Sequence, residues 1–390
     1  MASYISSNAN RFYTGLESAY GIVPTIGAGN RIPALKLTVQ HELEVTQRKD
    51  KTGSRTFVGL PTGGRRRTNF ELQTYLTTWQ QTGAPAYGPL FQSAFGASPL
   101  QYAGGTVSSA DAAGKVKFSA AHGLRAGQAL YSTGDVRFVA AIVDANTVQL
   151  NAPFTVIPAA GASIGVTVTY VPATEIPSVS IFDYWSPSTA VQRILSGAAV
   201  DQMDILVNGD YHEFHFRGVA QDVMDSSSFA GGGPQQLQSF PPEPALAAFD
   251  YTVVPGNLGQ AWLGTSPSQF FTITSASIQL KNALDTRTKE FGSNLPRAIA
   301  PGRRSVNATF TLHGLDDTAT TGLYQAARQQ SPVTVMFQLG ESSGQVMAVN
   351  LKSVIPQVPE FDDSSNRLQW KFRASRAQGT TDDELTVAFA

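Results

Sequence analysis

The sequence predicts a mainly β protein that contains one structural unit twice. Glycine (35) and proline (22) are common among its 390 residues, and long helix-forming runs are rare. Apolar and polar residues alternate along several segments, as in residues 35–39, and this period of two is typical of half-buried strands. One phrase also recurs, since GRRRTNFEL at 64–72 returns as GRRSVNATF at 302–310. Self-similarity at a fixed offset indicates a duplicated unit.

The repeated phrase keeps its residues at one spacing (302 − 64 = 238). Its matching residues are Gly64, Arg65, Arg66 and Asn69 in the first copy, and Gly302, Arg303, Arg304 and Asn307 in the second. We expect each copy to open a strand. The positions expected to face the core are Val306, Ala308, Phe310 and Leu312, which match Thr68, Phe70, Leu72 and Thr74 at the same offset. Because buried positions fall on buried positions, the two strands are expected to be equivalent.

Changes in composition divide the chain into five parts. Residues 1–30 are polar and predict an extended N-terminal arm. The first unit covers 31–99 and resumes at 174–225, because residues 100–173 have few charges and short valine-rich strands that predict a small β insertion. Residues 226–268 are rich in Gly, Pro, Ser and Gln, as a linker would be. Residues 269–390 form the second unit.

Local patterns predict the individual elements. Short helices are expected at 87–95 and 318–330, the second ending before Pro332. Strands are expected at 138–142, 147–150, 164–170, 178–184, 271–280, 333–339, 346–351, 368–374 and 385–389. Asn208-Gly209 predicts a two-residue hairpin turn that pairs Val207 with Asp210 and places Ile205 opposite His212 and Met203 opposite Phe214.

A charged loop precedes the repeated phrase in each unit, at 46–64 and at 285–301. The first loop carries Arg48, Lys49, Asp50, Lys51 and Arg55, and the second carries Asp285, Arg287, Lys289, Glu290 and Arg297. Charges of both signs at equivalent positions can set the register between like subunits. Two solvated hairpin tips explain the same charges equally well.

No pattern in the sequence predicts catalysis. The net charge is −1 with 15% charged residues, which argues against binding of nucleic acid by phosphate neutralisation. Cysteine is absent, and no apolar stretch approaches the roughly 20 residues of a membrane helix. His212 and His215 lie three apart on an expected strand, so they point to opposite faces and cannot share a metal ion. We expect no enzyme, no cofactor, no metal site and no membrane insertion.

Both units resemble the tube domain of tail tube proteins from long-tailed, siphovirus-like bacteriophages. In the second unit the similar segments are ITSASIQL at 273–280, the phrase at 302–312, LQWKFRA at 368–374 and the terminal strand at 385–389. In the first unit they are 35–39, 64–76, Leu195-Ser196-Gly197 and the strands around Asn208-Gly209. The resemblance implies a β-sandwich or split barrel with one flanking helix per unit.

The resemblance also implies a function. Sheets of neighbouring domains would join edge to edge, and two domains per chain would make a trimeric ring with pseudo-sixfold symmetry. Stacked rings would form the hollow tail tube of the virion, assembled in the host cytoplasm, which conducts DNA during infection. The implied partners are further copies of the chain, the tape-measure protein and DNA in the lumen, and tail terminator and tail-tip proteins at the ends. The charged loops and the arm would bridge rings, and the insertion would face outward.

The sequence leaves other functions open. The interrupted first unit is also compatible with a tail terminator, a tail-tip protein or a baseplate component. Clustered exposed Trp and Tyr would favour a virion protein that binds a receptor or carbohydrate. The chain has only four Trp, so this alternative has little support. A hydrolase would need a converging acid, base or nucleophile set, which the sequence does not offer.

Overall fold

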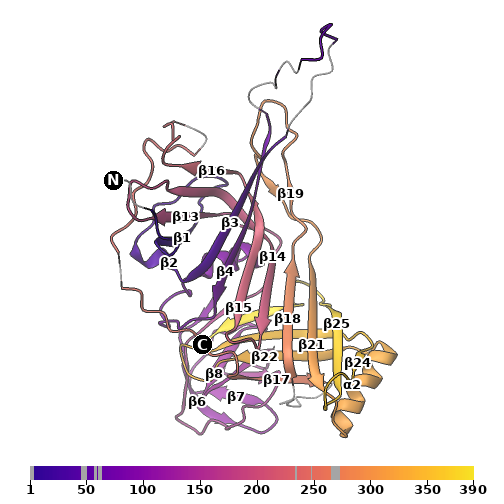
Figure 1. Ribbon diagram of the computed structural model, residues 1–390. Helices are drawn as coiled ribbons and strands as arrows, with labels where there is room; N and C mark the ends of the chain where they lie inside the picture. The colour runs from indigo at the N-terminus through magenta and orange to yellow at the C-terminus, as the bar shows by residue number, and fades with distance from the viewer. Residues whose placement is uncertain are drawn as a thin grey trace.

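The computed structural model describes residues 4–44, 51–56, 59, 64–232, 235–246, 248–264 and 273–390. Strands dominate this part of the chain and helices are few, which confirms the mainly β, sandwich-like class (Figure 1). None of its helices is long and apolar enough to cross a bilayer.

One long sheet runs through both halves of the chain. Its neighbouring strands, in spatial order, are β3 (Ala34–Leu43), β4 (Arg66–Tyr75), β15 (Glu213–Ala220), β14 (Arg193–Val207), β18 (Ile273–Lys281), β21 (Ser305–His313), β25 (Gln369–Ala377) and β24 (Glu360–Asp362). All of these neighbours pair antiparallel. The pairing of β14 with β18 joins the first half of the sheet to the second.

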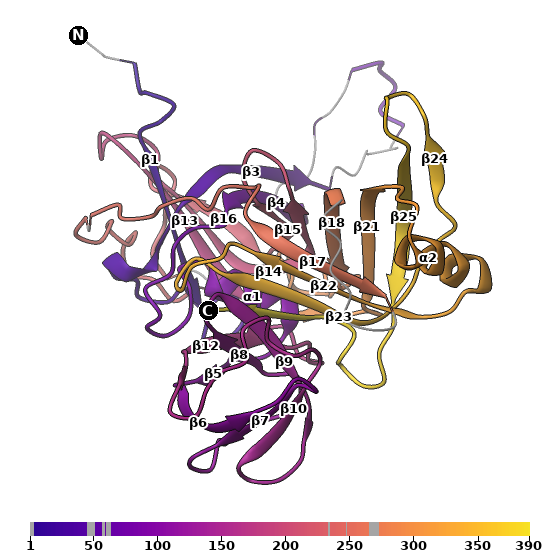
Figure 2. The same cartoon turned by 90° about the horizontal axis from the view of Figure 1, so that it is seen from below.

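A second layer of strands covers one face of the long sheet (Figure 2). In the first half it contains β2 (Arg31–Ile32), β1 (Asn10–Leu16), β13 (Val179–Trp185), the start of β14 and β16 (Asp222–Asp225). In the second half it contains β17 (Gly259–Gly264), β22 (Val333–Leu339), β23 (Met347–Ile355), β26 (Thr386–Phe389), β12 (Thr167–Tyr170) and β5 (Leu100–Tyr102). A short 3₁₀ turn, η1 (Ala28–Asn30), precedes β2.

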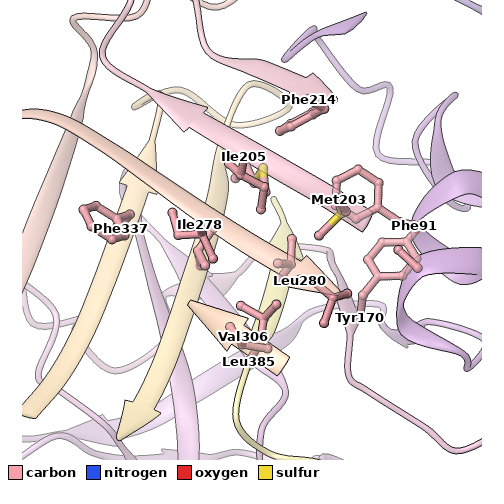
Figure 3. Packing of buried hydrophobic residues seen from close by; sticks show 14 of the residues in the cluster. Phe91, Tyr170, Met203, Ile205, Phe214, Ile278, Leu280, Val306, Phe337 and Leu385 are labelled. Atoms are coloured by element: carbon pink, nitrogen blue, oxygen red, sulfur yellow. The ribbon is translucent and has the colours of Figure 1, made fainter. Parts of the chain in front are cut away.

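A continuous apolar core lies between the two layers. Figure 3 shows Ile205, Ile278 and Phe337 from different strands packed into it, and all three are buried. Helix α1 (Gly88–Phe95) closes the core of the first half, where Leu90, Phe91 and Phe95 are fully buried. Helix α2 (Thr318–Gln329) lies at the corresponding place after β21. Both helices lie where the sequence predicts them.

The duplication extends through the whole unit. The first hairpin of each unit has the same bulge, which lies between Ala34 and Lys36 in β3 and between Ile273 and Ser275 in β18 (273 − 34 = 239). The β14–β15 hairpin returns as β24–β25, because Ile205 pairs with Phe214 as Phe361 pairs with Trp370 (361 − 205 = 156). The first part of β14 corresponds to β23, and prolines at 356 and 359 divide this long strand in the second unit.

The expected arm and linker each contain a strand of the duplicated unit, which corrects the sequence-based boundaries. β1, in residues 1–30, pairs along its length with β13, and β17, in residues 226–268, pairs along its length with β22. The two strands are therefore equivalent first strands. The sequence failed here because both segments have polar and glycine-rich surroundings, while strand pairing to a distant partner determines their structure.

The insertion is smaller than expected, because β5 and β12 at its two ends belong to the second layer. Between them lies a six-stranded sheet with its own apolar core. Its strands are β6 (Gly105–Ala110), β7 (Lys115–Phe118), β8 (Ala129–Ser132), β9 (Asp135–Ile142), β10 (Thr147–Leu150) and β11 (Ser163–Ile164). The single strand expected at 164–170 is thus two strands, β11 and β12, in different sheets.

The Asn208-Gly209 hairpin exists, but its predicted register is wrong by two residues. Ile205 lies opposite Phe214 rather than His212, and Met203 lies opposite Phe216. The loop is longer than two residues because a neighbouring segment binds it: the amide of Gly256 donates to the carbonyl of Asp210 at 3.1 Å. A shift of two preserves the inward face, so the predicted core residues are still buried.

Candidate assembly surface

The second charged loop extends past the ends of β18 and β21 and rises beside the neighbouring ends of β3 and β4 (Figure 1). It begins and ends with the two-stranded ribbon of β19 (Asp285–Thr286) and β20 (Ile299–Ala300). Its charges pair within the loop, where Glu290 contacts Arg287 and lies 3.9 Å from the guanidinium of Arg297. Asp285 and Lys289 are exposed, and the Phe291 side chain at the tip is completely exposed. The loop therefore presents an apolar tip on a charged stem.

The first charged loop is described only in part. Arg48, Lys49 and Asp50 lie outside the described residues, while Lys51 and Arg55 are exposed. The second loop contacts the start of β4 in the first unit, since the amide of Arg66 donates to the carbonyl of Asn294 at 2.9 Å. Nε2 of Gln221 also donates to the carbonyl of Pro296 at 3.1 Å. The loop of the second unit is thus hydrogen-bonded to the first unit at the end of the sheet where β4 begins.

The repeated phrase lies at the entry of β4 and β21, as the sequence predicts. A side chain at Gly302 would place its Cβ 2.4 Å from the carbonyl oxygen of Ala283, so only glycine fits there. Gly64 and Arg65 are half-buried beside Glu44, whose amide donates to the Arg65 carbonyl at 2.8 Å. Asn69 and Asn307 are half-buried, and Arg303 is exposed.

The second arginine of each phrase makes an equivalent ion pair within its own unit. Arg66 lies 3.6 Å from Asp222 at the start of β16, and Arg304 lies 2.9 Å from Glu384 just before β26. Since β16 and β26 occupy equivalent places, the pair is part of the duplication. Arg304 also contacts Asp382 at 3.0 Å and the carbonyl of Ala173. In each unit the second arginine therefore links the strand that the phrase opens (β4 or β21) to the last strand of the unit (β16 or β26).

Replacing Arg304 by alanine should destabilise the chain more than replacing Arg66. The Arg304 side chain is only 15% exposed and its loss leaves two carboxylates unpaired, so we expect a cost of about 1–3 kcal/mol. The Arg66 side chain is 41% exposed and its pair is longer, so about 0–1 kcal/mol is expected. Urea unfolding of the two variants measures the difference, and equal costs would contradict the argument.

A charged network crosses the pairing of β14 with β18, which is the joint between the two units. It lies on the face of the long sheet that the second layer does not cover, called the free face below. Asp204 of β14 accepts a hydrogen bond from Arg217 of β15 at 2.6 Å. Its other oxygen accepts from Nε2 of Gln279, on β18, at 2.9 Å. Arg217 also binds Glu71 of β4 at 3.0 Å. This network is not visible in the sequence, because its members become neighbours only through the pairing of four strands.

The Glu71 carboxylate of this network is held in its charged form. Burial alone would raise the pKa of Glu71, but hydrogen bonds from Gln73 and Arg217 and the charge of Arg217 bring it below its usual value. A carboxyl with a lowered pKa stabilises the folded chain at neutral pH. That contribution is lost as the pH falls through the folded-state pKa.

The two histidines point to opposite sides, as predicted. His212 is buried and its Nε2 lies 3.1 Å from the carbonyl of Leu258, while His215 pairs with Glu213 at 3.0 Å on the free face. Burial lowers the pKa of His212, with partial opposition from the Leu258 hydrogen bond. Among the described residues, no group of three or more His, Cys, Asp or Glu gathers in a way that could hold a metal ion.

The insertion docks on the outer side of the second layer, away from the long sheet (Figure 2). Gln338 of β22 is fully buried at this contact, where it accepts from the amide of Val136 at 2.9 Å and donates to the carbonyl of Gly134 at 2.7 Å. Apolar residues of both parts form one cluster there, including Phe138, Trp262 and Met336. The insertion is thus fixed on the second unit rather than loosely attached.

No protein-family model and no curated protein matches this chain.

Proposed function

We propose that this protein is a structural virion protein whose copies form rings, and that the rings stack into the hollow tail tube of a long-tailed bacteriophage. The observation that carries the proposal is the joint between β14 and β18, where two equivalent units combine their sheets edge to edge within one chain. Because the units repeat, the same joint can continue from one chain to the next. Three chains would then supply six units in a trimeric ring with pseudo-sixfold symmetry.

The two sides of the long sheet have different surroundings. The second layer and the insertion cover one side, while the free face carries polar groups such as Asp204, Arg217 and Gln279. In the proposed ring the free face lines the bore, through which the tape-measure protein and DNA pass, and the insertion faces outward. The charged loop with Phe291 at its tip projects along the axis and contacts the next ring.

Negative-stain electron microscopy of the purified full chain tests the proposal. We expect stacked rings or hollow tubes at high protein concentration. Single rings that do not stack would favour a tail terminator, and a monodisperse monomer would count against assembly altogether.

A deletion variant tests the outward position of the insertion. β5 and β12 pair through Tyr102 and Thr167, so an Asn-Gly turn can replace residues 103–166. We expect tubes of smaller outer diameter with an unchanged bore. The variant exposes Trp262 and Met336, which are now buried, so its solubility should fall. A folded variant without tubes would overturn the outward placement.

A further inference from the structure

The long sheet ends in two strands that have a free edge. Among the described residues, β3 pairs only with β4, and β24 pairs only with β25. Figure 2 shows β3 and β24 far apart at opposite ends of the sheet. Each free edge presents unpaired backbone amides and carbonyls, which can accept a further strand.

The internal joint shows which partner each edge would take. β18 is the equivalent of β3, and β18 is covered by the second part of β14. β24 is the equivalent of that part of β14. A joint between two chains would therefore place β24 of one copy against β3 of another, as β14 lies against β18 within the chain.

The duplication also sets the register of this pairing. In the internal joint Ile205 lies opposite Ile278, and Asp204 lies opposite Gln279. At the offset of 156, Phe361 and Glu360 are the equivalents of Ile205 and Asp204 (361 − 205 = 156). At the offset of 239, Val39 and Gln40 are the equivalents of Ile278 and Gln279 (278 − 39 = 239).

The side chains at these positions repeat the chemistry of the internal joint. Arg217 binds Asp204 at 2.6 Å, and the equivalent Arg373 binds Glu360 at 2.9 Å. Asp204 then accepts from the amide group of Gln279, and the position equivalent to Gln279 is again a glutamine, Gln40. Within one chain the arginine–carboxylate pair is present at β24, while the exposed Gln40 lies at the other end of the sheet.

The apolar residues at these positions support the same pairing as the polar ones. Ile205 and Ile278 are completely buried at the internal joint, whereas Phe361 is 57% exposed. Its ring stacks on Trp370 at 5.3 Å and lies 5.9 Å from Tyr324 of α2, so an aromatic surface is open at this edge. In the part of the chain that the structure describes, no strand covers Phe361 as β18 covers Ile205 in the first unit.

We propose that β24 pairs antiparallel with β3 of a second copy of this chain, with Phe361 opposite Val39 and Glu360 opposite Gln40. Glu360 accepts a hydrogen bond from the Gln40 amide group of the second copy, as Asp204 does from Gln279. The contact is head to tail, so each copy uses both edges. This inference rests on the proposed function and adds the partner strands and their register.

Cysteine cross-linking tests the register, because the chain contains no cysteine of its own. The test variant is Gln40→Cys with Glu360→Cys, oxidised under assembly conditions. Residues directly opposite in an antiparallel pair have Cβ atoms about 4.5–5.5 Å apart, which is close to disulfide geometry. We expect covalent oligomers that end at three chains, at least tenfold more abundant than in either single-cysteine variant.

Two further pairs are controls. Asp204→Cys with Gln279→Cys should form a disulfide within one chain, because this pair has the same geometry in the internal joint. Gln40→Cys with Asp362→Cys places the thiols diagonally, about 7–8 Å apart, and should cross-link at least tenfold less. Tubes that cross-link through the diagonal pair and not the test pair would overturn the register alone. Absence of both cross-links and rings would overturn the joint and the proposed function together.

Discussion

Replacing Phe91 by alanine is expected to lower the free energy of unfolding by about 3–5 kcal/mol. The side chain is fully buried, and its ring contacts six aromatic rings: Tyr87, Phe95, Tyr170, Phe214, Phe216 and Phe389. Figure 3 shows Phe91 beside Tyr170. Phe389 belongs to the second unit, so the loss of the ring weakens the packing of both units on each other. Urea unfolding should show a lower midpoint with an unchanged slope.

The duplicated unit supplies a matched control. Tyr324 of α2 contacts Trp370, which is the equivalent of the Phe214 that Phe91 contacts. Tyr324 is only half-buried in the isolated chain, so Tyr324→Ala should cost about 1 kcal/mol. It should nevertheless weaken ring formation, because its cluster with Phe361 lies at the free edge of β24. Equal losses of stability in the two variants would contradict this view of the second unit as incompletely covered.

The sequence predicted strands and helices well where the pattern is local. The alternation through 306–312 and 68–74 identified the buried faces of β21 and β4, and both are buried as expected. α1 and α2 begin and end within about one residue of the prediction. In these segments the apolar period and the turn residues already agree with the tertiary environment.

Long-range pairing was the part that the sequence could not supply. β1 and β17 have weak local patterns, and each becomes a strand because a distant partner is available. The network of Asp204, Arg217 and Gln279 is invisible for the same reason, since its members are widely spaced in the chain. The repeated arginine phrase was found from the sequence, but its partners Asp222 and Glu384 were not, because they stand at equivalent places without a recognisable repeat around them.

Replacing Arg137 by alanine is the second change with a large expected effect. Arg137 is 2% exposed and lies in the insertion at its contact with the second unit. Its guanidinium lies 4.6 Å from the ring centroid of Trp262 and donates to Asp135 at 3.2 Å and to the carbonyl of Pro153 at 2.8 Å. Burial lowers the pKa of Arg137, and the charge of Asp135 opposes this shift. Removing the cation leaves the buried Asp135 carboxylate without its charge partner, at a cost of about 3–5 kcal/mol.

A second variant separates the lost charge from the lost packing. Arg137→Met combined with Asp135→Asn keeps an apolar side chain against Trp262 and removes the buried carboxylate as well. Replacing both partners of a buried ion pair costs less than breaking it. The amide of Thr155 now donates to the Asp135 carboxylate at 2.7 Å, and the side-chain oxygen of an asparagine at this position can still accept that hydrogen bond. We therefore expect the double variant to recover more than half of the stability that Arg137→Ala loses.

Hydrogen exchange of β8 and β9 locates the effect of Arg137→Ala, because these strands should open first when the insertion loosens from β22. The amide of Val136 reports on this contact directly, since it donates to the side chain of Gln338 in the folded chain. Unchanged exchange in β8 and β9, with faster exchange in the long sheet, would show that Arg137 does not hold the insertion in place.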